Sequence, residues 1–390
     1  MAGPLSGVTV IDFSAYMAGP FATMILAEQG ADVIKVEPLA GDPMRSTNSK
    51  GRKTGAQAFN SNRAKRSIAL NIKDQRGLAI AERLIKGADV LVENFRAGVA
   101  DRLGLGYEKL SADNPGLIYV RASGVGPLGP EARRPVFDSV IQAMSGLCYL
   151  QSNEDGPQIA NTYAADKIAP LLLAQAVAAA LYERSVSGRG QYVEQSMLHA
   201  ALWWLWPDMM QTHTFTADDD DDERSPYSGK FIYATADGHL LVPPGRDEDW
   251  RALCRAMERP DMVDDERFAS VDLRIKNNAD VSEILTTEFA KRTTAEWKSR
   301  LTAEDAIFSI VNTPRSILTD EQVLANEMFT YLRTDTHGEI RAPTPPARFS
   351  RTPSSPGVGP ELGEHTEAVL TELGLSAGEQ SLLRDGGVIG

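Results

Sequence analysis

The stretch "VTVIDFSAYMAGPFATMILAEQGADVIKVEP", residues 8–38, decides the fold of this chain. Its first five residues form a short apolar run rich in β-branched side chains, which predicts a strand over 8–12. Apolar residues at helical spacing follow over 19–30, where Gly30 is a stop signal. A second strand is predicted over 31–37. A strand, a helix and a strand in this order predict a βαβ unit and therefore a parallel sheet.

The same alternation continues through the first half of the chain. We therefore predict an α/β fold in which the N-terminal part and the C-terminal segment form one Rossmann-like large domain, accompanied by a smaller α+β domain. The further predicted elements are strands at 67–71, 89–93, 117–121 and 191–197 and a helix at 75–86.

The predicted domains follow from changes of composition. The large domain covers 1–210, a linker with an acidic run covers 211–229, the small domain covers 230–325, and 326–390 returns to the large domain. The small domain contains a predicted hairpin with Asp237-Gly238 at its turn and helices at 280–290 and 294–302. The last segment contains a Pro-rich extended stretch, 341–366, and a final helix, 365–373.

Composition excludes several classes of protein. A net charge of −13 disfavours a nucleic-acid partner, which requires a basic face, and it also disfavours an anionic membrane surface. The two cysteines, Cys148 and Cys254, form neither a disulfide framework nor a metal motif. The N-terminus lacks the features of a signal peptide, and the longest apolar stretch, 168–181, is short for a bilayer span. We expect a soluble cytoplasmic protein without a membrane partner.

A local reversal of charge marks residues 45–73. No acidic residue interrupts this window, which suggests attraction to a polyanionic ligand, although a solvated basic loop would look the same. Its eight basic residues are Arg45, Lys50, Arg52, Lys53, Arg63, Lys65, Arg66 and Lys73.

Common catalytic motifs are missing from the sequence. Gly124, Gly126 and Gly129 fit a dinucleotide-binding spacing, but prolines interrupt the stretch and no helix is predicted to open there. The histidines show no metal-ligand spacing, and no serine-hydrolase elbow or phosphate-binding loop occurs. We therefore expect neither a metal nor a prosthetic group. Asp166 heads an otherwise apolar segment, 161–190, where it is either a helix cap or a nucleophile.

Five stretches together resemble the class III CoA-transferase family, which includes formyl-CoA and carnitine CoA-transferases and the 2-methylacyl-CoA racemases. They lie in the family's order and cover the first half of the chain densely. The stretches are 8–38, "NRAKRSIALNIKDQRG" (62–77), "ADVLVENFRAGVADRLGLGYEKLSADNPGLIYVRASGVG" (88–126), "FDSVIQAMSGL" (137–147) and "SGRGQYVEQSM" (187–197).

The resemblance implies that Asp166 is a nucleophile that moves CoA from an acyl-CoA donor to a small carboxylic acid through an aspartyl anhydride and an aspartyl-CoA thioester. We expect the helix N-terminus to keep this carboxylate ionised, and Asp138 to orient substrate or assist proton transfer. The resemblance also implies an interlocked homodimer, with the CoA thioester as a substrate. The residues that it places along CoA are Met17, Ala18, Leu70, Lys73, Asn94, Phe95, Arg102 and Phe137.

Three alternatives stay open at this point. A racemase needs two bases that flank the α-carbon, and Phe137 stands where the racemases carry a histidine, which favours the transferase. A non-catalytic CoA-thioester binder would retain the basic window and would not need Asp166. A nicotinamide oxidoreductase is disfavoured by the interrupted glycine motif.

Overall fold

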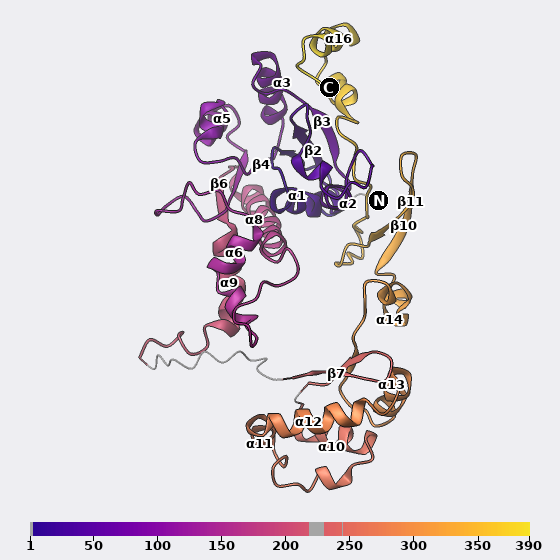
Figure 1. The fold of residues 1–390 in the computed structure, drawn as a ribbon. Helices are drawn as coiled ribbons and strands as arrows, with labels where there is room; N and C mark the ends of the chain where they lie inside the picture. Colours follow the sequence, from indigo (N-terminus) through magenta and orange to yellow (C-terminus); the bar gives the residue numbers. More distant parts are fainter. Residues whose placement is uncertain (1–2, 218–229, 244) are drawn as a thin grey trace. The chain divides into compact units, whose positions relative to one another are not determined.

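The computed structural model describes residues 3–217, 230–243 and 245–390 and divides into two compact units (Figure 1). One unit comprises Met1–Asp221 together with Glu327–Gly390, and the other comprises Asp222–Asn326. The C-terminal segment thus belongs to the same unit as the N-terminal half. Residues 218–229, which include the acidic run of the predicted linker, lie outside the described residues.

A six-stranded parallel sheet forms the centre of the first unit, with the strand order β3-β2-β1-β4-β5-β6. Its register places Ile11 of β1 opposite Ile34 of β2 and Leu91 of β4. The predicted parallel α/β fold is confirmed. Strands joined by helical crossovers pair in parallel, as they do here. The strands are β1 (Thr9–Asp12), β2 (Asp32–Glu37), β3 (Arg66–Ala69), β4 (Val90–Glu93), β5 (Ile118–Ser123) and β6 (Tyr192–Ser196).

Helices cover both faces of this sheet. Side chains of α1 (Ala18–Glu28) and α8 (Ala165–Ser187) pack with Val10 and its neighbours on one face. On the other face, α3 (Gln75–Lys86), α5 (Tyr107–Asp113) and the C-terminal α15 (Thr366–Glu372) pack around Ile11. This doubly wound arrangement leaves the carboxyl ends of the strands free to form a ligand site.

The helix α8 has 23 residues and extends beyond the apolar stretch 168–181 at both ends. By length and composition it could cross a membrane, so the expectation that no segment is long enough was wrong. Its apolar side chains have a different partner, because Leu173, Ala174 and Val177 pack against the sheet in the same core as Val10 and Val90. One face of α8 is therefore buried in the core of the first unit.

The first unit also contains elements that the sequence did not reveal. A hairpin joins β10 (Phe329–Thr334) to β11 (Gly338–Pro343) before the extended stretch. The helix α15 is not the last, as predicted, because α16 (Ala377–Asp385) follows it. The remaining elements of this unit are η1 (Pro43–Ser46), α2 (Ala56–Ser61), α4 (Val99–Arg102), α6 (Asp138–Met144), α7 (Leu147–Leu150) and α9 (Met197–Met209).

The second unit is a small α+β structure with its own core. Phe268, Phe289 and Trp297 are fully buried there. The predicted hairpin pairs β7 with β8, and β9 adds a third antiparallel strand. Its elements are β7 (Ile232–Ala234), β8 (His239–Leu241), α10 (Asp247–Ala256), η2 (Pro260–Met262), α11 (Val271–Lys276), α12 (Asn278–Phe289), α13 (Thr294–Ala303), β9 (Ser309–Ile310), η3 (Ser316–Thr319) and α14 (Glu321–Ala325).

Candidate active site

A cleft of about 770 Å³ opens at the carboxyl ends of the central strands. It lies where the strand order reverses between β1 and β4, the position at which doubly wound folds bind ligands. Asn94 links the two loops there: its Oδ1 accepts the Ala15 N–H at 2.9 Å, and its Nδ2 donates to the Ala15 carbonyl at 2.8 Å. The predicted residues Ala18, Asn94, Phe95, Phe137, Asp138 and Asp166 all line this cleft.

Two of these residues, Asp138 and Asp166, are held together by the starts of two helices. Asp138 is the first residue of α6 and Asp166 the second residue of α8. The backbone N–H of Asp166 donates to Asp138 Oδ1 at 3.1 Å. Asp138 is buried, whereas the Asp166 carboxyl is half-buried at the cleft wall. The structure therefore aims one carboxyl at the cleft and uses the other to hold it there.

Asp138 is itself positioned by Gln142, one turn further along α6. The fully buried Gln142 Nε2 donates to Asp138 Oδ2 at 2.6 Å and to the Thr162 carbonyl at 2.9 Å. Its Oε1 accepts the Ala160 N–H at 3.0 Å. One amide side chain thus fixes both Asp138 and the loop that leads into α8. Sequence reasoning missed Gln142, since an amide one turn along a helix carries no motif.

Asp166 does not cap its helix. The cap position of α8 is Ala164, and among the described residues no hydrogen bond reaches the Asp166 carboxylate. Burial, reinforced by the negative charge of Asp138, raises the pKa of Asp166 to about 6. The backbone N–H of Asp166 is taken by Asp138, which also adds a like charge, so the pKa of Asp166 is raised although the residue lies at a helix N-terminus. A carboxyl with this pKa is still roughly nine-tenths ionised at neutral pH.

Four predicted CoA residues lie outside the lining of this cleft. Leu70 is buried in the core, where it forms a β-bridge with Ile389. Met17 lines a second, largely apolar cleft of about 530 Å³ beside α1 and α8. Lys73 and Arg102 are exposed on the loop before α3 and on α4.

Half of the basic window has a structural role that was not predicted. Four of its eight cations form ion pairs inside the first unit, so they are not available to a phosphate. The pairs are Arg45–Glu37 (2.6 Å), Arg63–Glu28 (2.8 Å), Lys65–Asp12 (2.9 Å) and Arg66 with Asp32 (2.5 Å) and Glu372 (2.7 Å). The sequence could not reveal this, because the acidic partners lie on other segments. The remaining cations, Lys50, Arg52, Lys53 and Lys73, are exposed.

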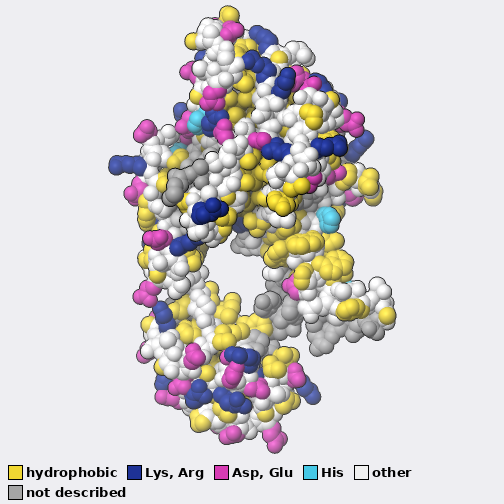
Figure 2. Space-filling model, turned by 180° about the vertical axis from the view of Figure 1, so that it is seen from behind, with side chains coloured by type: hydrophobic (Ala, Val, Ile, Leu, Met, Phe, Trp, Pro, Cys, Tyr) yellow, Lys and Arg dark blue, Asp and Glu magenta, His cyan; other side chains and the backbone are white. Residues whose placement is uncertain are grey.

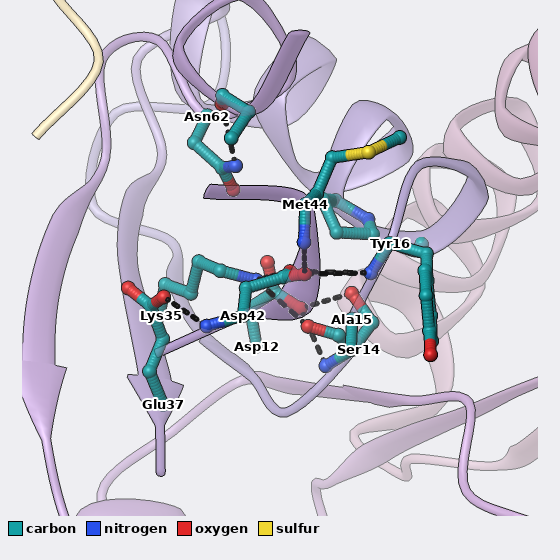
Figure 3. Close-up of polar contacts among 12 residues, drawn as sticks. Asp12, Ser14, Ala15, Tyr16, Lys35, Glu37, Asp42, Met44 and Asn62 are labelled. Carbon is teal, nitrogen blue, oxygen red and sulfur yellow. Dashed lines mark hydrogen bonds and ion pairs between the residues drawn. The ribbon is translucent and has the colours of Figure 1, made fainter. Parts of the chain in front are cut away.

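Buried charges also hold the loop between β1 and α1, which lines the cleft (Figure 3). We define Asp12, Lys35, Asp42 and Lys65 as the buried charge cluster, since each is at most 4% exposed. Lys65 Nζ donates to Asp12 Oδ2 at 2.9 Å, and Lys35 Nζ donates to Asp42 Oδ2 at 3.1 Å and to the Ser14 carbonyl at 2.8 Å. The cluster therefore fixes the backbone on which part of the cleft is built.

Sequence reasoning also missed positive charge in the cleft itself. Arg121 lies in β5 and lines the cleft. Its Nε is 3.8 Å from Glu93 Oε1 and 4.0 Å from Glu194 Oε1. Burial raises the pKa of Glu93 to about 7 despite this arginine. The other cleft arginines are Arg96, Arg133 and Arg134. The adjacent pair Arg133 and Arg134, in the loop before Asp138, was the sequence signal that could have revealed this positive charge.

The glycine motif lies in a loop rather than at the start of a helix. The chain leaves β5 at Ser123 and next becomes helical at Asp138, and Gly124 and Gly126 line the cleft. Among the residues that the structure describes, no group of three or more His, Cys, Asp and Glu side chains is arranged to hold a metal ion.

Comparison with known proteins agrees with this geometry. The family model described as CoA-transferase family III matches residues 5–366. Succinyl-CoA:glutarate CoA-transferase of Mus musculus is 32% identical, covering 95% of this chain and 86% of the relative. Succinate–glutarate CoA-transferase of Agrobacterium fabrum is 33% identical, with 95% and 96% covered. Acetyl-CoA:oxalate CoA-transferase of Acetobacter aceti is 36% identical, with 76% and 77% covered.

The fold is also similar to that of solved structures. A CAIB/BAIF family protein from Brucella suis superimposes with a TM-score of 0.85 at 29% identity, covering 96% of this chain and all of the other. The chain belongs to CoA-transferase family III and is an enzyme of this class. Members of the class use CoA thioesters as substrates.

Proposed function

We propose that this enzyme transfers CoA between an acyl-CoA and a small carboxylic acid through covalent intermediates on Asp166. The observation that carries the proposal is the state of this carboxyl. It lines the cleft without a hydrogen bond from any described residue, and its neighbour Asp138 adds a like charge. A carboxylate that is ionised but poorly solvated is a better nucleophile than one in water.

The proposed chemistry conserves atoms and charge. The Asp166 carboxylate attacks the thioester carbon, the C–S bond breaks, and CoA leaves as a thiolate while an anhydride forms. The thiolate attacks the aspartyl carbonyl and releases the donor acid, which leaves an aspartyl-CoA thioester. The acceptor carboxylate attacks this thioester and expels the thiolate, forming a second anhydride. The thiolate then attacks the acceptor carbonyl of that anhydride, which yields the new acyl-CoA and restores Asp166.

Asp138 and Gln142 act as positioning residues in this scheme. Asp138 holds the Asp166 backbone, and Gln142 holds Asp138 together with the preceding loop. Such support keeps the nucleophile close to its reactive geometry. The exposed Phe137 ring has no acid or base to offer, so the pair of bases that a racemase needs is not formed at this position.

For CoA, we propose that exposed cations at the cleft and its approaches bind the phosphates. Arg96 and Arg133 line the cleft, and Lys73 and Arg102 lie on the loop before α3 and on α4 of the same unit. Ala18, Asn94 and Phe95 would contact the pantetheine arm. For the acceptor, the named relatives act on oxalate and glutarate. The positive charge of Arg96 and Arg133, two cleft arginines that form no ion pair with a described residue, would favour such dicarboxylic acids.

We also propose a homodimer that works in the cytoplasm. Trp203, Trp204 and Trp206 of α9 are 61%, 53% and 44% exposed. Figure 2 shows hydrophobic side chains gathered in the region of α9. Burying such a patch against a second copy would remove a large apolar area from water. Both cysteines, Cys148 and Cys254, are free, which fits a reducing compartment.

An Asp166→Asn variant tests the proposed function. The amide has nearly the same volume but cannot form an anhydride, so transfer should fall by roughly 10³-fold or more, as loss of a nucleophile does elsewhere. Asp155→Asn is the control, since Asp155 is exposed and lies outside the cleft lining. CoA binding, measured by calorimetry, should survive in both variants. Full transfer activity in Asp166→Asn would exclude the covalent mechanism.

A further inference from the structure

Tyr16 adopts a backbone conformation that a side chain of its size rarely takes. Its φ is 67°, in the left-handed region that favours glycine. The residue lies on the loop between β1 and α1 and lines the cleft. A strained residue at a binding cleft persists only when the surrounding structure imposes it, and such residues cluster at functional sites.

The buried charge cluster imposes this conformation. Both carboxylate oxygens of Asp42 accept the Tyr16 N–H, each at 3.1 Å, and Asp42 is held in turn by the fully buried Lys35. Oδ1 of the same carboxylate accepts the Met44 N–H at 2.9 Å. Figure 3 shows the Tyr16 side chain directed away from the carboxylate that holds its backbone. Asp42 therefore fixes the backbone of the loop between β1 and α1, and the Tyr16 ring lines the cleft.

The Tyr16 ring meets a second aromatic ring from another loop. The ring centroids of Tyr16 and Phe137 lie 5.9 Å apart with an angle of 74° between the planes, an edge-to-face contact. Both rings line the cleft, and both are exposed, at 46% and 62%. The contact joins the loop after β1 to the loop after β5, so it closes part of the cleft from both sides.

This aromatic pair stands beside the proposed reaction centre. Phe137 immediately precedes Asp138, whose Oδ1 accepts the N–H of Asp166. The acyl group of an acyl-CoA whose thioester carbon reaches Asp166 must therefore fit next to the two rings. A short chain can lie against their faces, whereas a long or branched chain has to separate them.

We propose that Tyr16 and Phe137 form an acyl-size filter that selects short acyl groups and small carboxylic acids. The inference rests on the proposed function and names the residues that set its substrate range. The apolar ring faces bind the first methylenes of the acyl group, and the closed edge-to-face contact excludes longer chains. The buried charge cluster keeps the filter rigid, because it prevents Tyr16 from relaxing to an ordinary backbone conformation.

The test compares acetyl-, butyryl-, hexanoyl- and octanoyl-CoA as donors with the parent, Phe137→Ala and Tyr16→Ala. In each variant, kcat/KM for octanoyl-CoA relative to acetyl-CoA should rise roughly tenfold or more, the discrimination that apolar pocket contacts supply. Tyr16→Phe keeps the ring and should retain the parent's ratio. Tyr182→Ala, which removes a more exposed ring from α8 outside the cleft lining, should also leave the ratio unchanged.

Binding of the same series is measured by calorimetry alongside the kinetics. An unchanged chain-length ratio in both Phe137→Ala and Tyr16→Ala, in turnover and in binding, would overturn the filter. Selection by chain length in binding without any transfer by the parent would overturn the proposed function while supporting the filter. Loss of one variant to misfolding leaves the other to decide, because each ring comes from a separate loop.

Discussion

Asp12 and Asp166 are two desolvated aspartates of the same unit whose chemistry is opposite. Burial disfavours the charge of both, but the cations of Lys65 and Lys35 and hydrogen bonds from Ser14 and Thr23 lower the pKa of Asp12 to about 2. Asp166 has no such partners among the described residues, and burial together with Asp138 raises its pKa to about 6. The comparison teaches that surroundings, rather than residue type or burial alone, decide which carboxylate is structural and which is reactive.

The first prediction substitutes asparagine at each of the two positions. Asp12→Asn leaves Lys65 buried without its counter-charge and should lower the free energy of unfolding by about 3–5 kcal/mol. Asp166→Asn removes an unfavourable charge and should leave stability unchanged or raise it by about 1 kcal/mol at neutral pH. Chemical denaturation measures both. Equal losses of stability would break the comparison.

The second prediction concerns pH. The nucleophile is the ionised carboxylate, so kcat/KM should be constant above pH about 6 and fall about tenfold per pH unit below it. The contribution of Asp166 to folding stability should change in the opposite direction. Because its pKa is raised, the folded state binds the proton more tightly than the unfolded state does, so ionisation of Asp166 as the pH rises lowers the stability. Asp12, with its lowered pKa, contributes stability that is lost only as pH falls towards about 2. A flat rate profile down to pH 5 would contradict this account.

The third prediction changes the neighbour instead of the nucleophile. Asp138→Asn removes the second cause of the raised pKa, so the acid limb of the rate profile should move to lower pH, by less than about one unit since burial remains the larger cause. The maximal rate should fall as well, because the positioning of Asp166 is weakened. A residue with a purely structural role would lower the rate without moving the limb.

The fourth prediction, with the smallest expected effect, distinguishes the exposed cations of the basic window from its ion-paired cations by their effects on CoA binding and stability. Lys73→Ala should weaken CoA binding by about 1 kcal/mol without changing stability, because Lys73 is exposed. Arg102→Ala should behave in the same way. Arg63→Ala is the matched contrast, since it breaks a buried pair with Glu28 and should lower the melting temperature but not CoA affinity. Raising the salt concentration should weaken CoA binding to the parent. Loss of CoA affinity in Arg63→Ala, with no loss in Lys73→Ala, would contradict this division of the window into structural and CoA-binding cations.

The sequence predicted the succession of strands and helices along the chain, because hydrophobic periodicity is a local property. The runs at 8–12, 89–93 and 117–121 are each short and β-branched, and each became a strand. It also drew attention to Asp138 and Asp166, which lie together at the cleft. The family resemblance, rather than any property of these residues alone, supplied the proposed role of Asp166.

The errors share a physical cause, which is that they depend on contacts between distant segments. The partners of Arg45, Arg63 and Lys65 lie on other elements, so the window looked free when half of its charge is internal. The conformation of Tyr16 depends on Asp42, which is 26 residues away. Burial raises the pKa of Asp166, and the charge of Asp138, 28 residues away in the sequence, raises it further. Local patterns cannot report such pairings.

The most direct test of the central claim is to trap the intermediate. The parent enzyme is incubated with an acyl-CoA, quenched with hydroxylamine and digested, and the peptides are mapped by mass. A hydroxamate on the peptide carrying Asp166, absent in Asp166→Asn and present in Asp12→Asn where that variant folds, is the predicted result. A hydroxamate on another carboxylate, or none during active turnover, would contradict the account.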